Sequence, residues 1–184
     1  GVCEKEGYEC KLVDCITKAY TIEDTVEEVK IYAPDYIMAE ITTPTCSYYY
    51  KVINAIKEAY PKAKIMIGGT HATILPDAVL KECLGIDYIL RQEYDYTVGE
   101  IISSGDVSTV KGVSYRVNSD GMDLASLDDV NLLSDSIDFE IRHTDDREPL
   151  EDLDSLPYVS KVYEKYLNFD DYAYAFAQKP MIQI

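Results

Sequence analysis

The chain lacks an apolar run approaching the roughly 20 residues that a transmembrane helix requires. It also lacks the basic segment followed by an apolar segment that marks a secretory signal peptide. We therefore expect a protein without a membrane span, located in the cytoplasm.

Positive charge is scarce along the whole chain. Lysine and arginine contribute 17 residues against 34 aspartates and glutamates, and the formal net charge is -17. Because a nucleic-acid backbone attracts basic surfaces, this balance argues against a nucleic-acid partner. The charge is read as an aid to solubility, and the alternative is recognition of a basic partner.

Cysteines are few, and their spacing is irregular. An odd number without a CxxC pair is a poor disulfide framework, and it lacks the spacing of a metal site. We expect small buried side chains in a reducing compartment, with no metal and no iron–sulfur cluster held by this chain. The five cysteines are Cys3, Cys10, Cys15, Cys46 and Cys83.

Several catalytic and nucleotide-binding motifs are missing as well. The chain contains no GxGxxG fingerprint, no P-loop, no nucleophile elbow and no Ser-His-Asp order. No catalytic residue is therefore assigned from motifs.

Alternating strand and helix patterns are what the sequence does contain. Thr21 is positioned to cap a helix, with Asp24 three residues later, and Pro76 to open another. Strands alternating with helices predict an α/β fold with a mainly parallel sheet. The expected strands span residues 10–14, 35–41, 63–67, 86–90 and 112–117, and the other expected helices span 46–60 and 94–103.

Composition changes after residue 121. Residues 122–154 carry twelve acidic residues against two arginines, and this pattern is typical of a solvated linker. Helix-like patterning returns at residues 158–176. We therefore divide the chain into a domain at 1–121, an acidic C-terminal extension or linker at 122–157, and a helical segment at 158–184.

Ligands of parallel sheets bind outside the carboxyl ends of the strands, so the residues after each strand mark the candidate site. Thr42, Thr43, Pro44 and Thr45 offer three hydroxyls just before a helix, where phosphate, amide or ribose oxygens can bind. The alternative is that Thr45 simply caps that helix.

Two further segments follow strands. The pair Gly68-Gly69 removes Cβ atoms, so a flat ligand could lie on the backbone there, or the pair could simply form a tight turn. Thr70 and His71 follow, and a lone histidine more often bonds backbone or water than a ligand. The last segment, Arg91-Gln92-Glu93, could orient polar ligand groups or form a surface ion pair.

Five segments together resemble a known family. They are, in order, KEGYECKLVD, PDYIMAEITTPT, AKIMIGGTHATILPDAVL, IDYILRQE and EDLDSLPY. This series resembles the N-terminal domain of cobalamin-binding radical SAM enzymes, which include the anaerobic magnesium-protoporphyrin monomethyl ester cyclases. The resemblance covers residues 1–121 and returns at 151–158.

The resemblance implies a Rossmann-like, flavodoxin-like, doubly wound cobalamin (B12) domain. In that fold the Gly-Gly turn lets the dimethylbenzimidazole tail of the cofactor pass close to the backbone, and the hydroxyl loop lines the same pocket. We accordingly expect Gly69→Val to abolish binding while the domain stays folded. The candidate cofactor-binding residues are Thr42, Thr43, Pro44, Thr45, Gly68, Gly69, Thr70, His71, Arg91 and Glu93.

The chain departs from the family pattern in three places. The first strand of the family is missing, and it would lie between the strands expected at 10–14 and 35–41. These two strands would then pair directly, accept a strand from elsewhere, or lose order. Where many relatives read RGEGE this chain reads RQEYD, so Gln92 and Tyr94 replace glycines and crowd the pocket. The family's CxxxCxxC cluster motif would follow the last residues.

These features predict the cobalamin-binding domain of a B12-dependent radical SAM enzyme, a transferase or cyclase that methylates or remodels an unactivated carbon. Its partners would be the radical SAM domain of the same full-length chain, with S-adenosylmethionine and a [4Fe-4S] cluster, and a small-molecule substrate. The piece itself should catalyse nothing. The alternatives are a degenerate, cofactor-free module that binds a partner domain or substrate, and a flavodoxin-like or receiver domain.

Overall fold

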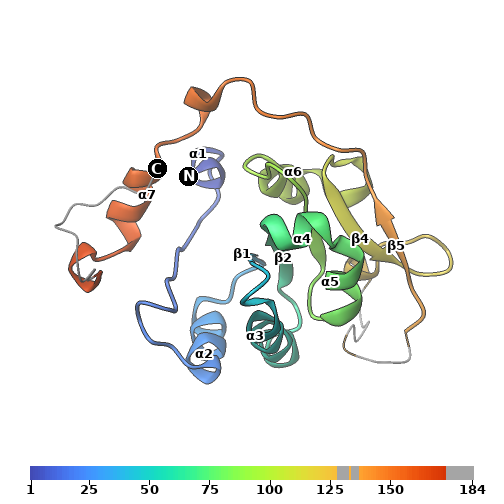
Figure 1. The fold of residues 1–184 in the computed structure, drawn as a ribbon, viewed down its shortest axis with the longest axis horizontal. Helices are drawn as coiled ribbons and strands as arrows, with labels where there is room; N and C mark the ends of the chain where they lie inside the picture. The colour runs from blue at the N-terminus through green and yellow to red at the C-terminus, as the bar shows by residue number, and fades with distance from the viewer. Residues whose placement is uncertain (128–132, 134–136, 173–184) are drawn as a thin grey trace.

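A five-stranded sheet forms the centre of the computed structural model, which describes residues 1–127, 133 and 137–172 (Figure 1). The strands follow one another across the sheet in chain order. The first three are parallel to one another, β4 is antiparallel to β3, and β5 is antiparallel to β4. The mainly parallel α/β sheet predicted from the sequence is therefore confirmed. The strands are β1 (Tyr36–Glu40), β2 (Lys64–Gly68), β3 (Tyr88–Leu90), β4 (Val113–Val117) and β5 (Glu140–His143).

The helices begin where the sequence provides start signals. Thr21 and Asp24 form a reciprocal capping box at the start of α2, and Pro76 is the first residue of α5. One short helix, α4, was not predicted. The α-helices are α1 (Val2–Lys5), α2 (Ile22–Tyr32), α3 (Cys46–Ala59), α4 (Thr70–Ile74), α5 (Pro76–Glu82), α6 (Thr97–Ser104) and α7 (Val159–Tyr166). None of the described helices is long and apolar enough to cross a membrane.

Helices cover both faces of the sheet. Successive residues of a strand point to opposite sides, so an apolar strand presents apolar side chains on both faces. Ile65 and Ile67 of β2 lie in one core cluster, together with Ile53 of α3. Met66 lies in the other cluster, with Ile101 of α6. Helices therefore lie on both faces of the sheet, in agreement with the Rossmann-like fold predicted from the sequence.

A buried ion pair joins α3 to the start of β3. The ammonium of Lys57 lies 2.7 Å and 3.0 Å from the two carboxylate oxygens of Asp87, and it also donates to the carbonyl of Ala63 at 2.9 Å. Asp87 in turn accepts a bond from the Ile65 amide at 2.6 Å. Burial raises the pKa of the Asp87 carboxyl, and Lys57 opposes that effect. The pair fixes where β2 and β3 begin.

The prediction of a strand at residues 10–14 is wrong. That segment has no regular structure, and it is held from the side by an ion pair between Lys11 and Glu28 of α2. The hydroxyl of Tyr166 on α7 donates to the Cys10 carbonyl at 2.6 Å. In Figure 1 the segment, in blue, runs outside the sheet between α1 and α2. A strand needs a neighbour for its backbone groups, and no described strand lies beside this segment.

The edge of β1 is consequently open. Among the described residues β2 is the one strand that pairs with β1, and β1 is only half-buried whereas β2 is almost fully buried. Of the three outcomes expected for a missing strand, neither direct pairing nor a substitute strand occurs in the described part of the chain.

The acidic segment contributes to the sheet, which its prediction as a linker did not anticipate. β5 pairs along β4 from Ser114↔His143 to Val117↔Glu140. Further on, α7 returns to α1, where Lys165 and Tyr166 donate to the carboxylate of Glu4. These bonds lower the pKa of Glu4 to about 2. The helical patterning predicted at 158–176 is confirmed at α7, and residues 173–184 lie outside the described residues.

Replacing Lys57 by methionine should destabilise the fold by about 3–5 kcal/mol, because it leaves the Asp87 carboxylate buried without its partner. Lys51→Met on the same helix is the matched control, since Lys51 is exposed, and it should change stability by less than about 0.5 kcal/mol. Urea unfolding followed by circular dichroism measures both. Equal stabilities of the two variants would contradict a structural role for the buried pair.

Candidate functional site

The loops after β1, β2 and β3 meet at the carboxyl edge of the parallel strands. The Thr43 hydroxyl lies 3.0 Å from Nδ1 of His71, which joins the first loop to the second. The backbone amide of Gln92 donates to the Thr73 hydroxyl at 3.0 Å, which joins the third loop to the second. The structure therefore brings together residues 42–45, called the hydroxyl loop, and residues 68–71, called the glycine–histidine segment. The sequence predicts both as parts of a site at this edge.

The hydroxyl loop keeps its side chains away from the helix that follows. Thr45 occupies the N-cap position of α3 but does not cap it, because its backbone is helical (φ -111°, ψ -9°) rather than extended. Its hydroxyl instead lies 3.0 Å from that of Thr42. Thr42, Thr43, Pro44 and Thr45 are all exposed. The alternative that Thr45 serves as a side-chain cap is therefore wrong, and the loop presents its hydroxyls at the surface.

Gly69 is required by the backbone itself. Its φ is +97°, and a Cβ there would lie 2.7 Å from the carbonyl oxygen of Ile41. The two strands are this close because the Ile41 amide donates to the Gly68 carbonyl at 3.1 Å. A side chain at 69 would disturb the turn whether or not a ligand is present. We therefore expect Gly69→Val to destabilise the fold itself, contrary to the expectation that this variant would affect cofactor binding alone.

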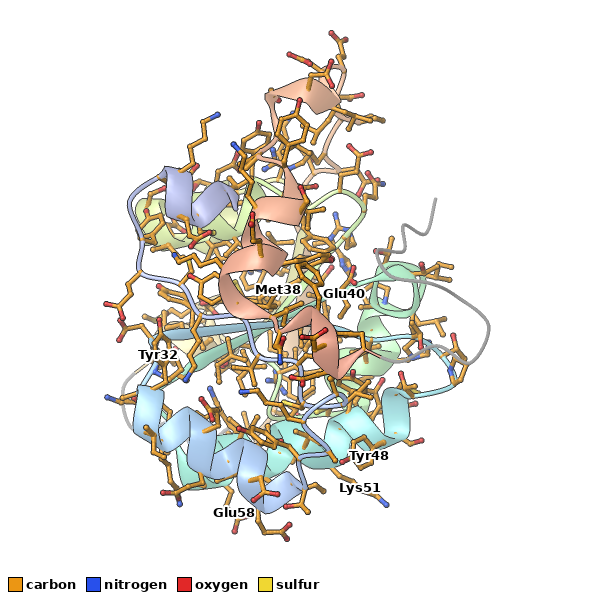
Figure 2. The ribbon with its side chains drawn as sticks, turned by 90° about the vertical axis from the view of Figure 1, so that its left-hand side faces the viewer. Tyr32, Met38, Glu40, Tyr48, Lys51 and Glu58 are labelled. Atoms are coloured by element: carbon orange, nitrogen blue, oxygen red, sulfur yellow. The ribbon has the colours of Figure 1, made fainter. Side chains whose placement is uncertain are left out.

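Gly68 is close to a side chain rather than to backbone. A Cβ at Gly68 would lie 2.6 Å from Cε1 of Tyr94 and 2.8 Å from Cε of Met38. The Tyr94 hydroxyl donates to the carboxylate of Glu40, which is the residue paired with Gly68 in the sheet. Burial, together with this bond, raises the pKa of the Tyr94 phenol. Figure 2 shows Met38 and Glu40 side by side, between the layer with α2 and α3 and the layer with α1 and α6.

Arg91 is directed into the sheet rather than toward the loops. One guanidinium nitrogen donates to the Val113 carbonyl at 2.8 Å and to the Ser114 hydroxyl at 2.7 Å. The other donates to the Thr144 carbonyl at 2.6 Å and to Asp146 at 2.9 Å. The side chain is 9% exposed. These bonds hold the chain after β5 against β4.

Glu93 has a similar partner. Its carboxylate accepts a bond from the Leu150 amide at 2.6 Å, so it fixes the same returning segment from the outside. Of the predicted site residues, Arg91 and Glu93 are therefore the two that the structure joins to residues 144–150. The other eight lie in the loop after β1, at the end of β2, or between there and the first turn of α4.

Gln92 adopts a left-handed backbone conformation with φ +60°. An ordinary side chain there costs roughly 1–2 kcal/mol relative to glycine. This strain explains why glycine suits the position, and it keeps the Gln92 amide pointing at Thr73.

A serine–histidine–aspartate row lies near β5, away from these loops. The Ser114 hydroxyl lies 2.8 Å from Nδ1 of His143, whose Nε2 lies 3.1 Å from Asp77. Ser114 is fully buried and accepts a bond from Arg91, so it is not an accessible nucleophile. Within the described residues, no group of three histidine, cysteine, aspartate or glutamate side chains is arranged to hold a metal ion.

Sequence reasoning found Tyr94 only through the family resemblance, and it missed Glu40 and Met38 as site residues. The available signal was the two-residue period of β1. Met38, Glu40 and the paired Gly68 share one face of the sheet, so both side chains lie beside the glycine.

Comparison with known proteins shows the family of this chain. A family model described as "B12 binding domain" matches residues 1–102. An uncharacterized methyltransferase of Pyrococcus horikoshii is 27% identical over 118 residues, which cover 62% of this chain and 26% of that protein.

Two relatives are called anaerobic magnesium-protoporphyrin IX monomethyl ester cyclase. The protein from Cereibacter sphaeroides is 25% identical over 150 residues, which cover 81% of this chain and 24% of that protein. The protein from Rubrivivax gelatinosus is 25% identical over 123 residues, which cover 62% of this chain and 22% of that protein. The chain thus spans about a quarter of the length of these curated relatives. These matches confirm the resemblance predicted from the sequence.

Gly69→Ala should destabilise the fold by roughly 2–4 kcal/mol, through backbone strain plus the clash with Ile41. Gly105→Ala is the matched control, because Gly105 also has a positive φ (+68°) but a Cβ there would meet nothing within 4 Å. Thermal unfolding of both variants separates strain from clash. An equal loss of stability in the two variants would show that the approach of Ile41 to Gly69 is not a constraint on the fold.

Proposed function

Because the chain belongs to the B12-binding domain family, we propose that it is the cobalamin-binding domain of a B12-dependent radical SAM enzyme. The full-length protein would transfer a methyl group to an unactivated carbon of a small-molecule substrate, or remodel that carbon, in the cytoplasm. The names of the relatives, a methyltransferase and two cyclases, support both forms of this proposal.

The observation that carries the proposal is the meeting of the hydroxyl loop with the glycine–histidine segment at one sheet edge. The hydroxyls of Thr42, Thr43 and Thr45 would line the pocket of the nucleotide tail and exchange hydrogen bonds with its polar groups. Thr43 engages Nδ1 of His71 and so fixes the orientation of the imidazole ring. Gly68 supplies a floor without a side chain, and Gly69 holds the turn in place.

The remaining candidates act around this edge. Pro44 and Thr70 would bound the two loops, whereas Arg91 and Glu93 would support the edge indirectly through their bonds to the returning segment. When bound, cobalamin supplies a carrier for a methyl group or an electron. The chain's own residues bind and orient it.

The division of the chain follows the same reasoning. Residues 1–121 would bind the cofactor, residues 122–157 would form an acidic linker or extension, and residues 158–184 would lead into the radical SAM domain. That domain would hold S-adenosylmethionine and a [4Fe-4S] cluster, and it is the expected partner of the surface described here.

One observation favours a second candidate function. The ring of Tyr94 lies over Gly68, in the space that a ligand at this edge would use. This arrangement supports a cofactor-free module that binds the partner domain or the substrate itself.

Titration of the chain with hydroxocobalamin, followed by visible absorption, separates the two functions. We expect saturable binding, and Thr43→Val should weaken it roughly 5–10-fold, since it removes one hydrogen-bonding group and releases His71. Ser103→Ala, which deletes an exposed hydroxyl on α6, is the matched control and should bind like the parent. Absence of any spectral change with folded protein would favour the cofactor-free function, and equal affinities of parent and Thr43→Val would move the site away from this loop.

A further inference from the structure

We propose that Tyr94 is a displaceable plug that decides which corrinoids this domain accepts. Its phenol ring fills the slot above Gly68, and its hydroxyl bond to Glu40 holds it there. The inference rests on the proposed cobalamin-binding function and adds to it a specificity residue at the same edge.

The slot is defined by three residues. Gly68 forms its floor, and it is buried although it carries no side chain. A Cβ at this position would come within 2.8 Å of Cε of Met38, and within 2.6 Å and 3.0 Å of two carbons of the Tyr94 ring. The missing side chain of Gly68 is therefore what gives the ring room to lie against the backbone.

The hydroxyl bond closes the slot without making closure permanent. The raised pKa of Tyr94 keeps the phenol neutral, so it can donate to the carboxylate of Glu40. Glu40 is exposed at the end of β1. Its carboxylate can therefore exchange the phenol for water when the ring leaves. Breaking this bond, which we call the latch, costs little because neither partner is left without a hydrogen bond.

The backbone on both sides of Tyr94 is fixed by hydrogen bonds, whereas its side chain is only half-buried, packed against the core cluster that contains Met66 and Ile101. On one side, Gln92 is tied to Thr73 by its amide. On the other side, the carbonyl of Tyr94 accepts a bond from the Thr97 amide at 3.0 Å at the start of α6. Opening the slot thus requires a rotamer change of one half-buried side chain, and it leaves the loop in place.

The family resemblance places the nucleotide tail of the cofactor at the Gly-Gly turn, and the shape of the slot agrees with that placement. A slot filled by one phenol ring is far too narrow for a corrin macrocycle, but it suits a planar aromatic base. The nucleotide base is the planar aromatic part of cobalamin, so its entry would require Tyr94 to leave. A corrinoid without that base would bind without displacing Tyr94.

A double-mutant cycle tests the plug without any ligand. Gly68→Ala should lower the melting temperature of the parent, because the methyl group meets the Tyr94 ring and Met38. It should lower it less in a Tyr94→Gly background, where the contact with Met38 remains but the contact with the ring is gone. Equal losses in the two backgrounds would mean that the ring does not rest on Gly68, which overturns the proposal.

Binding of two probes tests the specificity. We expect dicyanocobinamide, which lacks the nucleotide base, to bind the parent at least as tightly as hydroxocobalamin. Tyr94→Gly should raise the affinity for hydroxocobalamin roughly tenfold or more and leave that for dicyanocobinamide within about twofold. Tyr94→Phe keeps the ring but removes the latch, so its gain should be smaller.

The possible failures are distinguishable. If both probes bind but their affinity ratio is the same in the parent and in Tyr94→Gly, the plug is wrong and the proposed function stands. If neither probe binds any folded variant, the proposed function is wrong, and the specificity inference falls with it.

Discussion

The close approach of the end of β1 to the turn after β2 is the constraint on which the carboxyl edge depends. The Ile41 amide bonds to the Gly68 carbonyl, and the Ile41 carbonyl lies where a side chain at Gly69 would be. This contact requires glycine at residue 69, and it lies next to the place where the hydroxyl loop contacts His71. It also aligns Glu40 with Gly68 in the sheet. The glycines that leave space for a ligand therefore lie beside the residue that holds the Tyr94 ring in that space.

The edge therefore combines two opposing features. Exposed hydroxyls and a bare glycine floor suit a large polar cofactor, whereas the ring of Tyr94 and the chain of Met38 fill the floor. Both features are explained if the ring is a plug held by one exchangeable hydrogen bond to Glu40. Affinity and selectivity then reside in different parts of one site, with the hydroxyl loop serving the first and the slot above Gly68 the second.

Local signals made much of the fold predictable, and non-local contacts account for what was missed. The capping box at Thr21 and the helix and strand periodicities depend on neighbours in sequence, so they could be read directly. The strand expected at 10–14 failed because strand formation depends on a partner along its length. Arg91 follows a strand as predicted, but its direction depends on carbonyls that come from β4 and the segment after β5. The bond between Glu40 and Tyr94 joins residues 54 positions apart, which no local pattern encodes.

The most direct test of the central claim is a crystal structure of the chain with hydroxocobalamin, in which anomalous scattering locates the cobalt atom. The account predicts cobalt outside the carboxyl ends of β1 and β2, next to the threonine loop, with the Tyr94 ring rotated away from Gly68 and the nucleotide base in its place. Cobalt bound elsewhere, or a base bound while the ring still rests on Gly68, would contradict it.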